Sequence, residues 1–208
     1  MATGVKNRLK AINLLCLLFH METKINPNTM ESVTEYIQSS IRDVPDFPKP
    51  GIIFKDITTL LADPKALRLT IDLLVDKYKG QKIDFIAAPE SRGFIFATPV
   101  SYLLNCGVTP IRKPGKLPAK TIEHSYELEY GTDTLCIHED AFKGIDNPQV
   151  IIIDDLLATG GSCSATIELV QKAGGHVIGA GFVIELGFLE ARKKLEAKGV
   201  EVFSILNI

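Results

Sequence analysis

The spacing of apolar and polar residues changes its period along the chain. Between residues 30 and 44, apolar positions recur every three to four residues, which predicts an amphipathic helix that three following prolines end. Residues 64–78 repeat the helical spacing, and Pro64 suits the first turn of a helix. A short apolar stretch at residues 52–54 separates these two segments. The first third of the chain therefore predicts two helices around one short extended stretch.

The period then changes to short runs that are apolar throughout. Runs of this kind are typical of strands buried on both faces of a parallel sheet. Helical spacing at residues 94–105 and 163–173 separates some of them. This alternation predicts an α/β fold, a doubly wound and mostly parallel sheet flanked by helices. The strand-like runs lie at residues 83–88, 108–111, 150–153 and 177–184.

One segment interrupts the alternation. Residues 113–120 are rich in Lys, Pro and Gly, and residues 121–130 alternate between polar and apolar side chains. Glycine and proline mark turns, while strict alternation favours a half-buried strand. We expect a mobile hairpin, or flap, between residues 114 and 130.

The residues that follow the four strand-like runs are unusually polar. In open α/β sheets, ligands bind beyond the carboxyl ends of the strands. We therefore expect these four segments to converge on one site. They are residues 89–93, 112–113, 154–155 and 185–187.

Composition narrows the possible partners. The 208 residues are 46% hydrophobic and 23% charged, which suits one globular domain with a substantial core. A formal net charge of -2 gives no general attraction to nucleic acid or anionic lipid, so we expect neither partner and a purely local anion site. The four cysteines lack metal-ligand spacing and the density of a disulfide-rich secreted domain. A cytoplasmic location follows as an expectation.

The beginning of the chain resembles a signal peptide only in part. Three basic residues precede the apolar run at residues 11–19, but charged residues follow where a cleavage site needs small ones. The run is also too short to cross a bilayer as a helix. We expect residues 1–29, with Met21 and Met30 as alternative starts, to be an extension outside a domain that comprises residues 30–208.

The loop after the third run combines two kinds of chemistry. A buried strand leads into Asp154 and Asp155, and Ala-Thr-Gly-Gly-Ser at residues 158–162 comes just before a helix. Glycines let backbone N–H groups face an anion, and the helix N-terminus and the hydroxyls of Thr159 and Ser162 favour phosphate there. Carboxylates suit sugar hydroxyls, or magnesium held through water. The loop therefore predicts a phosphate beside a ribose.

Residues 150–162 resemble the phosphoribosyl-pyrophosphate signature of the type I phosphoribosyltransferases. A Walker-B strand or a response-regulator pocket would share the acidic strand end, but no Gly-x-x-x-x-Gly-Lys loop is present for the first, and the second needs no Thr-Gly-Gly-Ser. The resemblance covers most of residues 30–208 and points to members that use adenine. Four further segments carry it, at residues 47–57, 90–94, 112–118 and 125–131.

The resemblance implies a reaction, a fold and partners. Adenine and phosphoribosyl pyrophosphate would give AMP and pyrophosphate with Mg²⁺, in purine salvage, on a cytoplasmic homodimer whose fold includes an N-terminal hood. It assigns ribose and 5′-phosphate to Asp154, Asp155, Ala158, Thr159, Gly160, Gly161 and Ser162. It assigns pyrophosphate to Glu90, Ser91, Arg92, Arg112, Lys113 and Lys116, with a non-proline cis peptide in the loop at residues 90–92. It leaves magnesium to the substrate, without dedicated protein ligands.

The resemblance also assigns the base and the proton chemistry. Adenine would lie against Ile53, Phe54, Lys55 and Leu186. Arg92 would stabilise the leaving group, Glu129 would exchange a proton with adenine, and Tyr130 would cover the site. Members of the family commonly carry arginine where this chain has Lys55, and lysine lacks the stacking and bidentate contacts of arginine.

Two other functions fit the same residues. One is a phosphoribosyltransferase for another purine, such as hypoxanthine or xanthine, which a competition between bases would reveal. The other is a regulator that senses the sugar phosphate without catalysis. Such a regulator would lack the flap residues and add a basic DNA-binding segment, whereas this chain has the flap and only three basic residues ahead of its apolar run.

Overall fold

A computed structural model describes residues 27–127 and 131–208. The chain divides into two units, residues 1–36 and residues 37–208, and the second holds all the strands of the described part. The elements are α2 (Pro27–Ser39), β1 (Arg42–Pro45), β2 (Ile53–Asp56), α3 (Thr58–Ala62), α4 (Pro64–Tyr78), β3 (Phe85–Pro89), α5 (Gly93–Leu104), β4 (Gly107–Ile111), β5 (Thr121–Glu127), β6 (Thr132–His138), β7 (Gln149–Leu157), α6 (Gly161–Lys172), β8 (His176–Glu185), η1 (Gly187–Leu189), α7 (Ala191–Glu196) and β9 (Glu201–Asn207).

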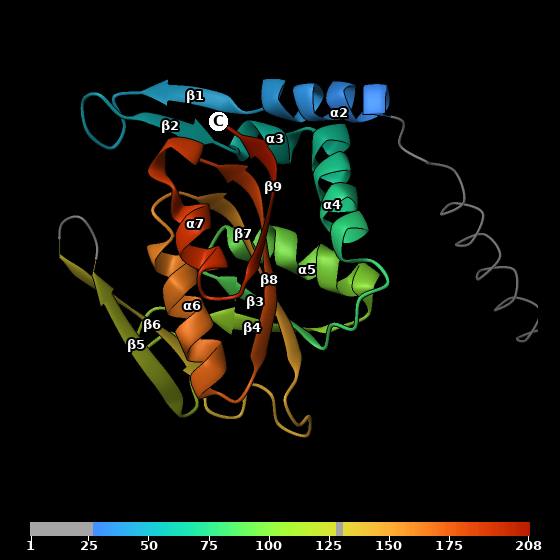
Figure 1. The fold of residues 1–208 in the computed structure, drawn as a ribbon. Helices are drawn as coiled ribbons and strands as arrows, with labels where there is room; N and C mark the ends of the chain where they lie inside the picture. Colours follow the sequence, from blue (N-terminus) through green and yellow to red (C-terminus); the bar gives the residue numbers. More distant parts are fainter. Residues whose placement is uncertain (1–26, 128–130) are drawn as a thin grey trace, which may run out of the picture. The chain divides into compact units, whose positions relative to one another are not determined.

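A five-stranded parallel sheet forms the centre of the second unit, in the order β4-β3-β7-β8-β9 (Figure 1). From β3 the chain passes through α5 to the edge strand β4, and from β7 it passes through α6 in the opposite direction to β8. The connections therefore diverge between β3 and β7. A crevice outside the carboxyl ends of the strands at such a point is where α/β sheets bind ligands.

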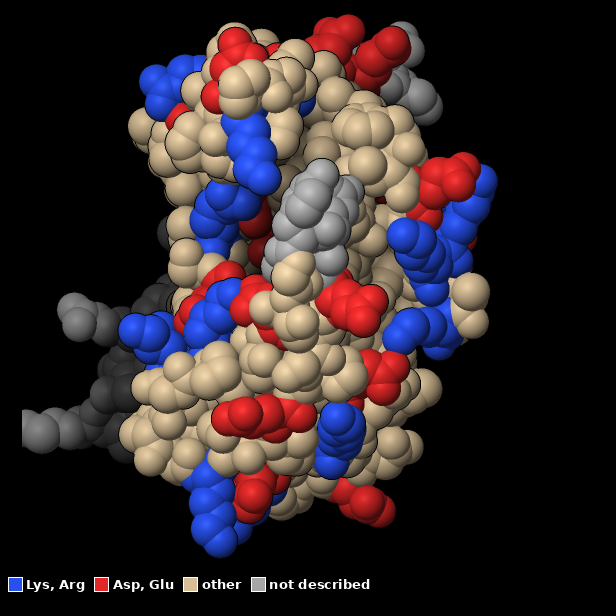
Figure 2. Space-filling view, turned by 90° about the vertical axis from the view of Figure 1, so that its left-hand side faces the viewer, with Lys and Arg blue, Asp and Glu red and all other residues tan. Residues whose placement is uncertain are grey.

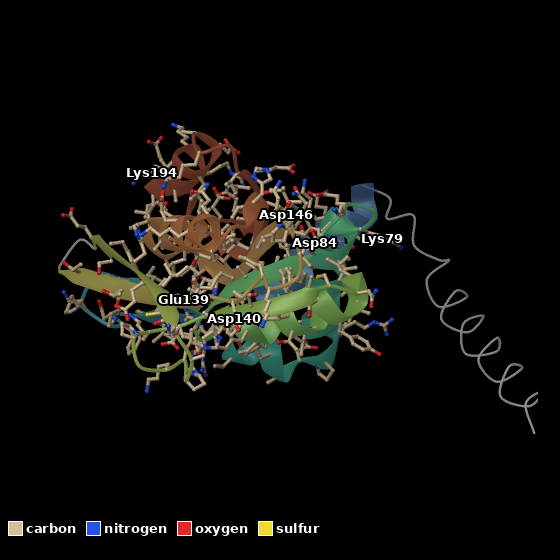
Figure 3. All side chains as sticks on the ribbon, turned by 90° about the horizontal axis from the view of Figure 1, so that it is seen from below. Lys79, Asp84, Glu139, Asp140, Asp146 and Lys194 are labelled. Atoms are coloured by element: carbon tan, nitrogen blue, oxygen red, sulfur yellow. The ribbon has the colours of Figure 1, made fainter. Side chains whose placement is uncertain are left out.

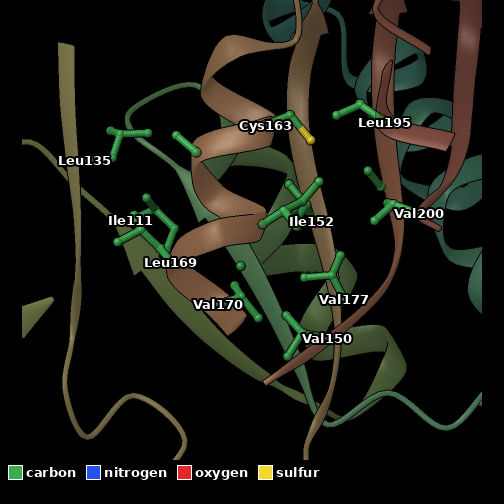
Figure 4. Packing of buried hydrophobic residues seen from close by; sticks show 14 of the residues in the cluster. Ile111, Leu135, Val150, Ile152, Cys163, Leu169, Val170, Val177, Leu195 and Val200 are labelled. Atoms are coloured by element: carbon green, nitrogen blue, oxygen red, sulfur yellow. The ribbon is translucent and has the colours of Figure 1, made fainter. Parts of the chain in front are cut away.

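Alternate residues of the central strands face different helices. Ile152 of β7 packs with Val170 and Leu169 of α6, in the cluster that Figure 4 shows from close by. On the other face, a Cβ on Gly181 of β8 would lie 2.8 Å from the side chain of Ile153 and 3.1 Å from Tyr78 of α4. The sheet is thus buried on both faces, which confirms the prediction from its continuously apolar runs.

The helix predicted at residues 64–78 is confirmed at both ends. Asp63 caps it, because its side chain accepts hydrogen bonds from the backbone N–H groups of Lys65 and Ala66 at 2.8 and 3.1 Å. An acceptor at this position satisfies N–H groups that have no partner within the helix, and Pro64 follows in the first turn.

The first predicted helix is wrong at its C-terminal end. It ends at Ser39, and residues 42–45 form β1, which pairs antiparallel with β2 so that Val44 lies opposite Phe54. The helical spacing of residues 40–44 does not reveal this pairing, because the partner strand lies about ten residues further along the chain. The resemblance predicted an N-terminal hood, and its assignment to these two strands stays a prediction.

The alternation at residues 121–130 correctly predicted a strand, β5, but its antiparallel partner β6 lies beyond the predicted end of the hairpin at residue 130. Backbone hydrogen bonds between Arg112 and Cys136, of 3.0 and 2.7 Å, connect β6 to the end of β4. Residues 128–130, which include Glu129 and Tyr130, lie outside the described part. The mobility of the hairpin stays a prediction.

Four acidic residues lie in loops, with Asp84 just before β3, Asp146 before β7, and Glu139 and Asp140 after β6. Figure 3 labels all four in a view from below. Asp84 is also structural, since its carboxylate accepts a 2.8 Å hydrogen bond from the backbone N–H of Gln149. Within residues 27–127 and 131–208, no helix is long and apolar enough to cross a membrane.

Candidate active site

A cavity of about 520 Å³ opens where the sheet connections diverge. Its walls come from the residues after β3, the end of β7 with the start of α6, and the β5–β6 hairpin. Figure 2 shows Lys and Arg side chains along one edge of a hollow on the face that carries the hairpin. The lining residues are Pro89, Glu90, Ser91, Arg92, Lys113, Tyr126, Asp133, Leu135, Asp154, Asp155, Leu156, Leu157, Ala158, Thr159, Gly160, Gly161 and Ser162.

The predicted phosphate turn lies at the N-terminus of α6. Gly160 has φ +80°, a left-handed conformation that a residue with a side chain rarely adopts. A Cβ at Gly160 would lie 3.2 Å from Ala191, and one at Gly161 would lie 3.3 Å from the ring of Tyr126. The backbone N–H groups of the first helical turn have no partner within the helix and favour an anion. The turn therefore suits a phosphate.

The two predicted carboxylates lie near the end of β7, where Asp155 is buried and Asp154 is partly buried. Asp155 is 4% exposed, and its backbone N–H donates to Oδ1 of Asp154 at 2.9 Å. Burial, followed by the charge of Asp155, raises the pKa of Asp154 well above its ordinary value. A Cβ on Gly93 would lie 2.9 Å from Asp154 Oδ1, so glycine is needed there for α5 to begin this close to β7.

Arg92 joins the loop after β3 to this carboxylate pair. Its Nε lies 2.6 Å from Oδ2 of Asp155, and its guanidinium carbon lies 5.4 Å from the centre of the Phe54 ring. The predicted cis peptide bond is present between Glu90 and Ser91. All three residues of the predicted pyrophosphate loop line the cavity.

The basic residues that follow β4 do not all reach the cavity. Lys113 lines the cavity, whereas Arg112 and Lys116 are not among its lining residues. The Nε of Arg112 donates to Glu90 Oε2 at 2.7 Å, and its Nη1 donates to the backbone carbonyl of Lys116 at 3.4 Å. Arg112 therefore holds Glu90 of the predicted pyrophosphate loop.

The structure brings only part of the predicted adenine set toward the cavity. Phe54 faces Arg92, as described above. Lys55 on the same strand points elsewhere, since its Nζ lies 2.8 Å from Asp43 beside a second, smaller pocket. Ile53 is 58% exposed. Leu186 does not line the cavity, and its backbone N–H donates to the backbone carbonyl of Leu157 at 2.9 Å.

The end of β8 does not reach the cavity, in contrast to the expected convergence of four strand ends. Glu185 is 3% exposed and bonds the guanidinium of Arg192 and the hydroxyl of Ser204. Burial opposes ionisation of Glu185, but these hydrogen bonds outweigh it and lower its pKa. Its carboxylate therefore holds α7 and β9 against β8.

Tyr126 and Asp133 line the cavity, although neither was predicted from the sequence as a site residue. They are cross-strand partners in the β5–β6 hairpin. The alternation at residues 121–127 indicated that one face of this strand packs inward, but it did not show which partner Tyr126 would meet. Pairing across the hairpin depends on the turn between the strands.

This site belongs to a known class. Residues 56–207 match the model of the phosphoribosyl transferase domain, which spans well over half of the chain. The fold agrees, with a parallel sheet between helices and a phosphate turn that follows a carboxylate pair. The chain belongs to the phosphoribosyltransferase family.

Relatives narrow this assignment to one branch. An adenine phosphoribosyltransferase of Desulfitobacterium hafniense is 54% identical over 167 residues, 80% of this chain and 94% of that protein. The crystal structure of the Thermoanaerobacter pseudethanolicus adenine phosphoribosyltransferase is 50% identical, with a TM-score of 0.79 over 84% of this chain and 99% of that one. A yeast structure complexed with adenine and an iminoaltritol bisphosphate is 36% identical, with a TM-score of 0.76 over 85% and 99%. Within the family, the chain groups with the adenine phosphoribosyltransferases.

Proposed function

We propose that the protein is a pentosyltransferase of purine salvage, which joins adenine to phosphoribosyl pyrophosphate and releases AMP and pyrophosphate. The observation that carries this proposal is one cavity that combines the phosphate turn, the carboxylate pair and Arg92. A phosphate, a ribose and a second anionic group can bind side by side there. The adenine phosphoribosyltransferases to which the chain is similar supply the identity of the base.

The ribose 5-phosphate half occupies the β7 side of the cavity. Residues 158–162 take the 5′-phosphate through backbone N–H groups and the hydroxyls of Thr159 and Ser162. Asp154 and Asp155 accept hydrogen bonds from the ribose hydroxyls, as acidic residues do in other nucleotide-binding sheets. This arrangement fixes the anomeric carbon between the carboxylate pair and the loop after β3.

The pyrophosphate group lies on the other side, against Glu90, Ser91 and Arg92. A guanidinium can bind two phosphate oxygens at once, and Lys113 adds a second positive charge. Arg112 and Lys116 act from the positions described above. Negative charge grows on the leaving pyrophosphate, so fixed positive groups there stabilise the transition state more than the ground state.

Mg²⁺ fits the carboxylates of this cavity as a substrate-carried ion. The described residues contain no group of three side chains that could hold a metal by themselves. Mg²⁺ keeps several waters and commonly binds one or two carboxylates together with substrate phosphates. When bound, the ion would neutralise part of the pyrophosphate charge.

The base lies toward the hood, where Phe54 faces Arg92. Ile53 and Leu186 complete the assignment through the family resemblance, which also includes Lys55, although the ammonium of Lys55 pairs with Asp43 in this structure. Glu129 exchanges a proton with adenine, and Tyr130 covers the site, so that water does not intercept the cationic ribose. Both residues come between β5 and β6 in the sequence, outside the described part of the chain.

The assembly we propose is a homodimer. Helix α5 exposes Ile95, Tyr102 and Leu103, and the spacing of seven and eight residues places them on one face. Tyr102 is 84% exposed, which is unusual for a large aromatic side chain unless a partner covers it. Light scattering should give twice the chain mass, and Tyr102→Asp should shift the protein toward a monomer.

Two further expectations concern the compartment and the domain. Cys106, Cys136 and Cys163 are free thiols, which supports a reducing compartment such as the cytoplasm. We assign catalysis to residues 30–208 and place residues 1–29 outside that domain. The family match at residues 56–207 supports this division.

Formation of AMP from radiolabelled adenine tests the proposed function. The reaction should require both phosphoribosyl pyrophosphate and Mg²⁺. The double variant Asp154→Asn, Asp155→Asn should lose turnover while its far-ultraviolet circular dichroism stays unchanged. Full activity in that variant would contradict the role of the carboxylate pair, and no AMP from the unaltered protein would contradict the proposed function itself.

A further inference from the structure

Lys113, Tyr126 and Asp133 form a cluster on the wall of the cavity. The ammonium of Lys113 forms an ion pair with Oδ2 of Asp133, and the hydroxyl of Tyr126 donates to the same oxygen at 3.2 Å. The other oxygen, Oδ1, accepts the backbone N–H of Thr134 at 2.8 Å. Asp133 therefore has two donors on one oxygen and a backbone donor on the other.

The cluster connects two parts of the proposed substrate site. Lys113 follows the end of β4, on the pyrophosphate side, while the ring of Tyr126 lies against Gly161 of the phosphate turn. The side chains of Lys113 and Asp133 are 44% and 24% exposed, so the pair is open to the cavity that both line. A solute anion can therefore reach the ammonium of Lys113.

The pair presents an electrostatic conflict for an anionic substrate. A lysine attracts a pyrophosphate group most strongly when its charge is unshared, yet Asp133 neutralises Lys113 and adds a negative charge beside the same anion. The phosphate oxygens and Asp133 therefore compete for one ammonium group. Lysine has a flexible stem, so a change of partner needs only rotation of its side chain.

Asp133 can lose Lys113 without losing all its donors. Tyr126 remains bonded to Oδ2, and an acceptor that keeps a donor avoids most of the cost of an unsatisfied polar group. Burial, followed by the charge of Asp133, raises the pKa of Tyr126 to about 12, so the phenol stays a donor at neutral pH. The hydrogen bond from Lys113 is the largest cause of the lowered pKa of Asp133, which is accordingly ionised.

We propose that Asp133 is a positioning residue that competes with the pyrophosphate group for Lys113. Lys113 leaves Asp133 for the phosphate oxygens when the anion binds and returns when it departs, while Tyr126 retains Asp133. The inference rests on the proposed function, which assigns this side of the cavity to pyrophosphate. The competition lowers the affinity of the site for pyrophosphate and so favours release of that product.

Direct binding of inorganic pyrophosphate tests this competition. Calorimetric titrations, with and without Mg²⁺, compare the unaltered protein with Asp133→Asn, Lys113→Met and the double variant. Asparagine keeps an acceptor for Tyr126 but removes the charge. We expect Asp133→Asn to bind pyrophosphate roughly 1.5-fold to fivefold more tightly, the range that corresponds to losing a partly exposed ion pair. Lys113→Met should bind more weakly.

The double variant separates competition from simple repulsion. If Asp133 acts through Lys113, Asp133→Asn should change the affinity little once Lys113 is absent. An equal gain in the Lys113→Met background, or weaker or unchanged binding by Asp133→Asn alone, would overturn the inference. Asp140→Asn makes the same charge change at a residue that does not line the cavity and should leave the affinity unchanged.

Two controls keep the result interpretable. Asp133→Ser replaces the asparagine variant if thermal melting shows that the latter does not fold, and the same tightening is expected of it. The unaltered protein is assayed for AMP formation in parallel. Failure of that assay would reject the proposed function, whereas normal AMP formation with an unchanged pyrophosphate affinity in the Asp133 variants would reject only the role of Asp133.

Discussion

Arg92 and Asp155 are joined across the point where the sheet connections diverge, with Nε of the arginine 2.6 Å from Oδ2 of the aspartate. The carboxylate is almost buried, whereas the arginine side chain is 42% exposed. Asp155 therefore anchors a cation that remains accessible from the cavity. The pair connects the proposed pyrophosphate loop to the proposed ribose site.

Asp155→Asn should reduce kcat/KM for phosphoribosyl pyrophosphate by about 10²–10³-fold, the effect of removing one preorganised polar group from an active site. The variant loses both the charge that anchors Arg92 and a strong acceptor for a ribose hydroxyl. Steady-state kinetics with the sugar substrate varied measure the loss. Asp146→Asn, on the opposite side of the molecule, is the matched control, and an equal effect of both substitutions would contradict the assignment.

Asp154→Asn should stabilise the fold at neutral pH although it lowers activity. Burial and the charge of Asp155 raise the pKa of Asp154 in the folded protein. Protonated Asp154 therefore stabilises the fold fully at a pH below its unfolded pKa near 3.8. This contribution is lost as the pH rises through the folded pKa. The amide carries no such penalty. Its gain should resemble the about 0.5–2 kcal/mol of common stabilising substitutions.

Thermal melts between pH 4 and pH 8 check this expectation. The difference in Tm between the variant and the unaltered protein should grow with pH. A difference that is constant, or that shrinks as pH rises, would show that ionised Asp154 costs the fold nothing.

Glu185→Gln should destabilise the protein by about 2–4 kcal/mol, because it removes one partner of a largely buried ion pair. The pKa of Glu185 is lowered, whereas that of Asp154 is raised, so the two groups affect stability in opposite directions as pH changes. Its contribution is present above the ordinary pKa near 4.5 and is lost as pH falls through the folded value. The variant should therefore differ from the unaltered protein less in acid than at neutral pH.

Urea unfolding at pH 7 and at low pH measures this contribution. Glu190→Gln is the control, since Glu190 pairs with Lys193 on the exposed surface and its loss should destabilise the protein far less than the loss of Glu185. Equal destabilisation by the two substitutions would contradict a structural role specific to Glu185.

Gly160→Ala should raise KM for phosphoribosyl pyrophosphate roughly tenfold or more, because a strained phosphate turn no longer presents its N–H groups to the anion. Gly174→Ala is its matched control. Both glycines have positive φ, of +80° and +90°, so each variant should lose about 1–3 kcal/mol of stability. Only Gly160 lines the cavity, and an equal change of KM in both variants would indicate a general effect of strain.

The sequence revealed those parts of the fold whose signal is local. The apolar run at residues 150–153 is a strand buried on both faces, and the phosphate turn directly follows the carboxylate pair, so both could be predicted from neighbouring residues. The strand β1 and the final strand β9 escaped prediction. Each is short and becomes a strand through pairing with a partner that local spacing does not specify.

The same limit applies to the site. Glu185 ends β8 much as Asp154 lies near the end of β7, yet a bidentate bond from Arg192 of α7 holds its carboxylate away from the cavity. Asp43 of β1 likewise forms an ion pair with Lys55 of β2. Tyr126 and Asp133 meet only because of the register of β5 and β6. Side-chain partners across elements are set by tertiary packing.

The most direct test of the central claim is a competition between bases at a fixed concentration of phosphoribosyl pyrophosphate and Mg²⁺. Adenine, hypoxanthine and xanthine are supplied together, and the three nucleoside monophosphates are separated and counted. AMP should make up nearly all of the product. Comparable formation of the hypoxanthine nucleotide, or no nucleotide at all from an intact protein, would contradict it.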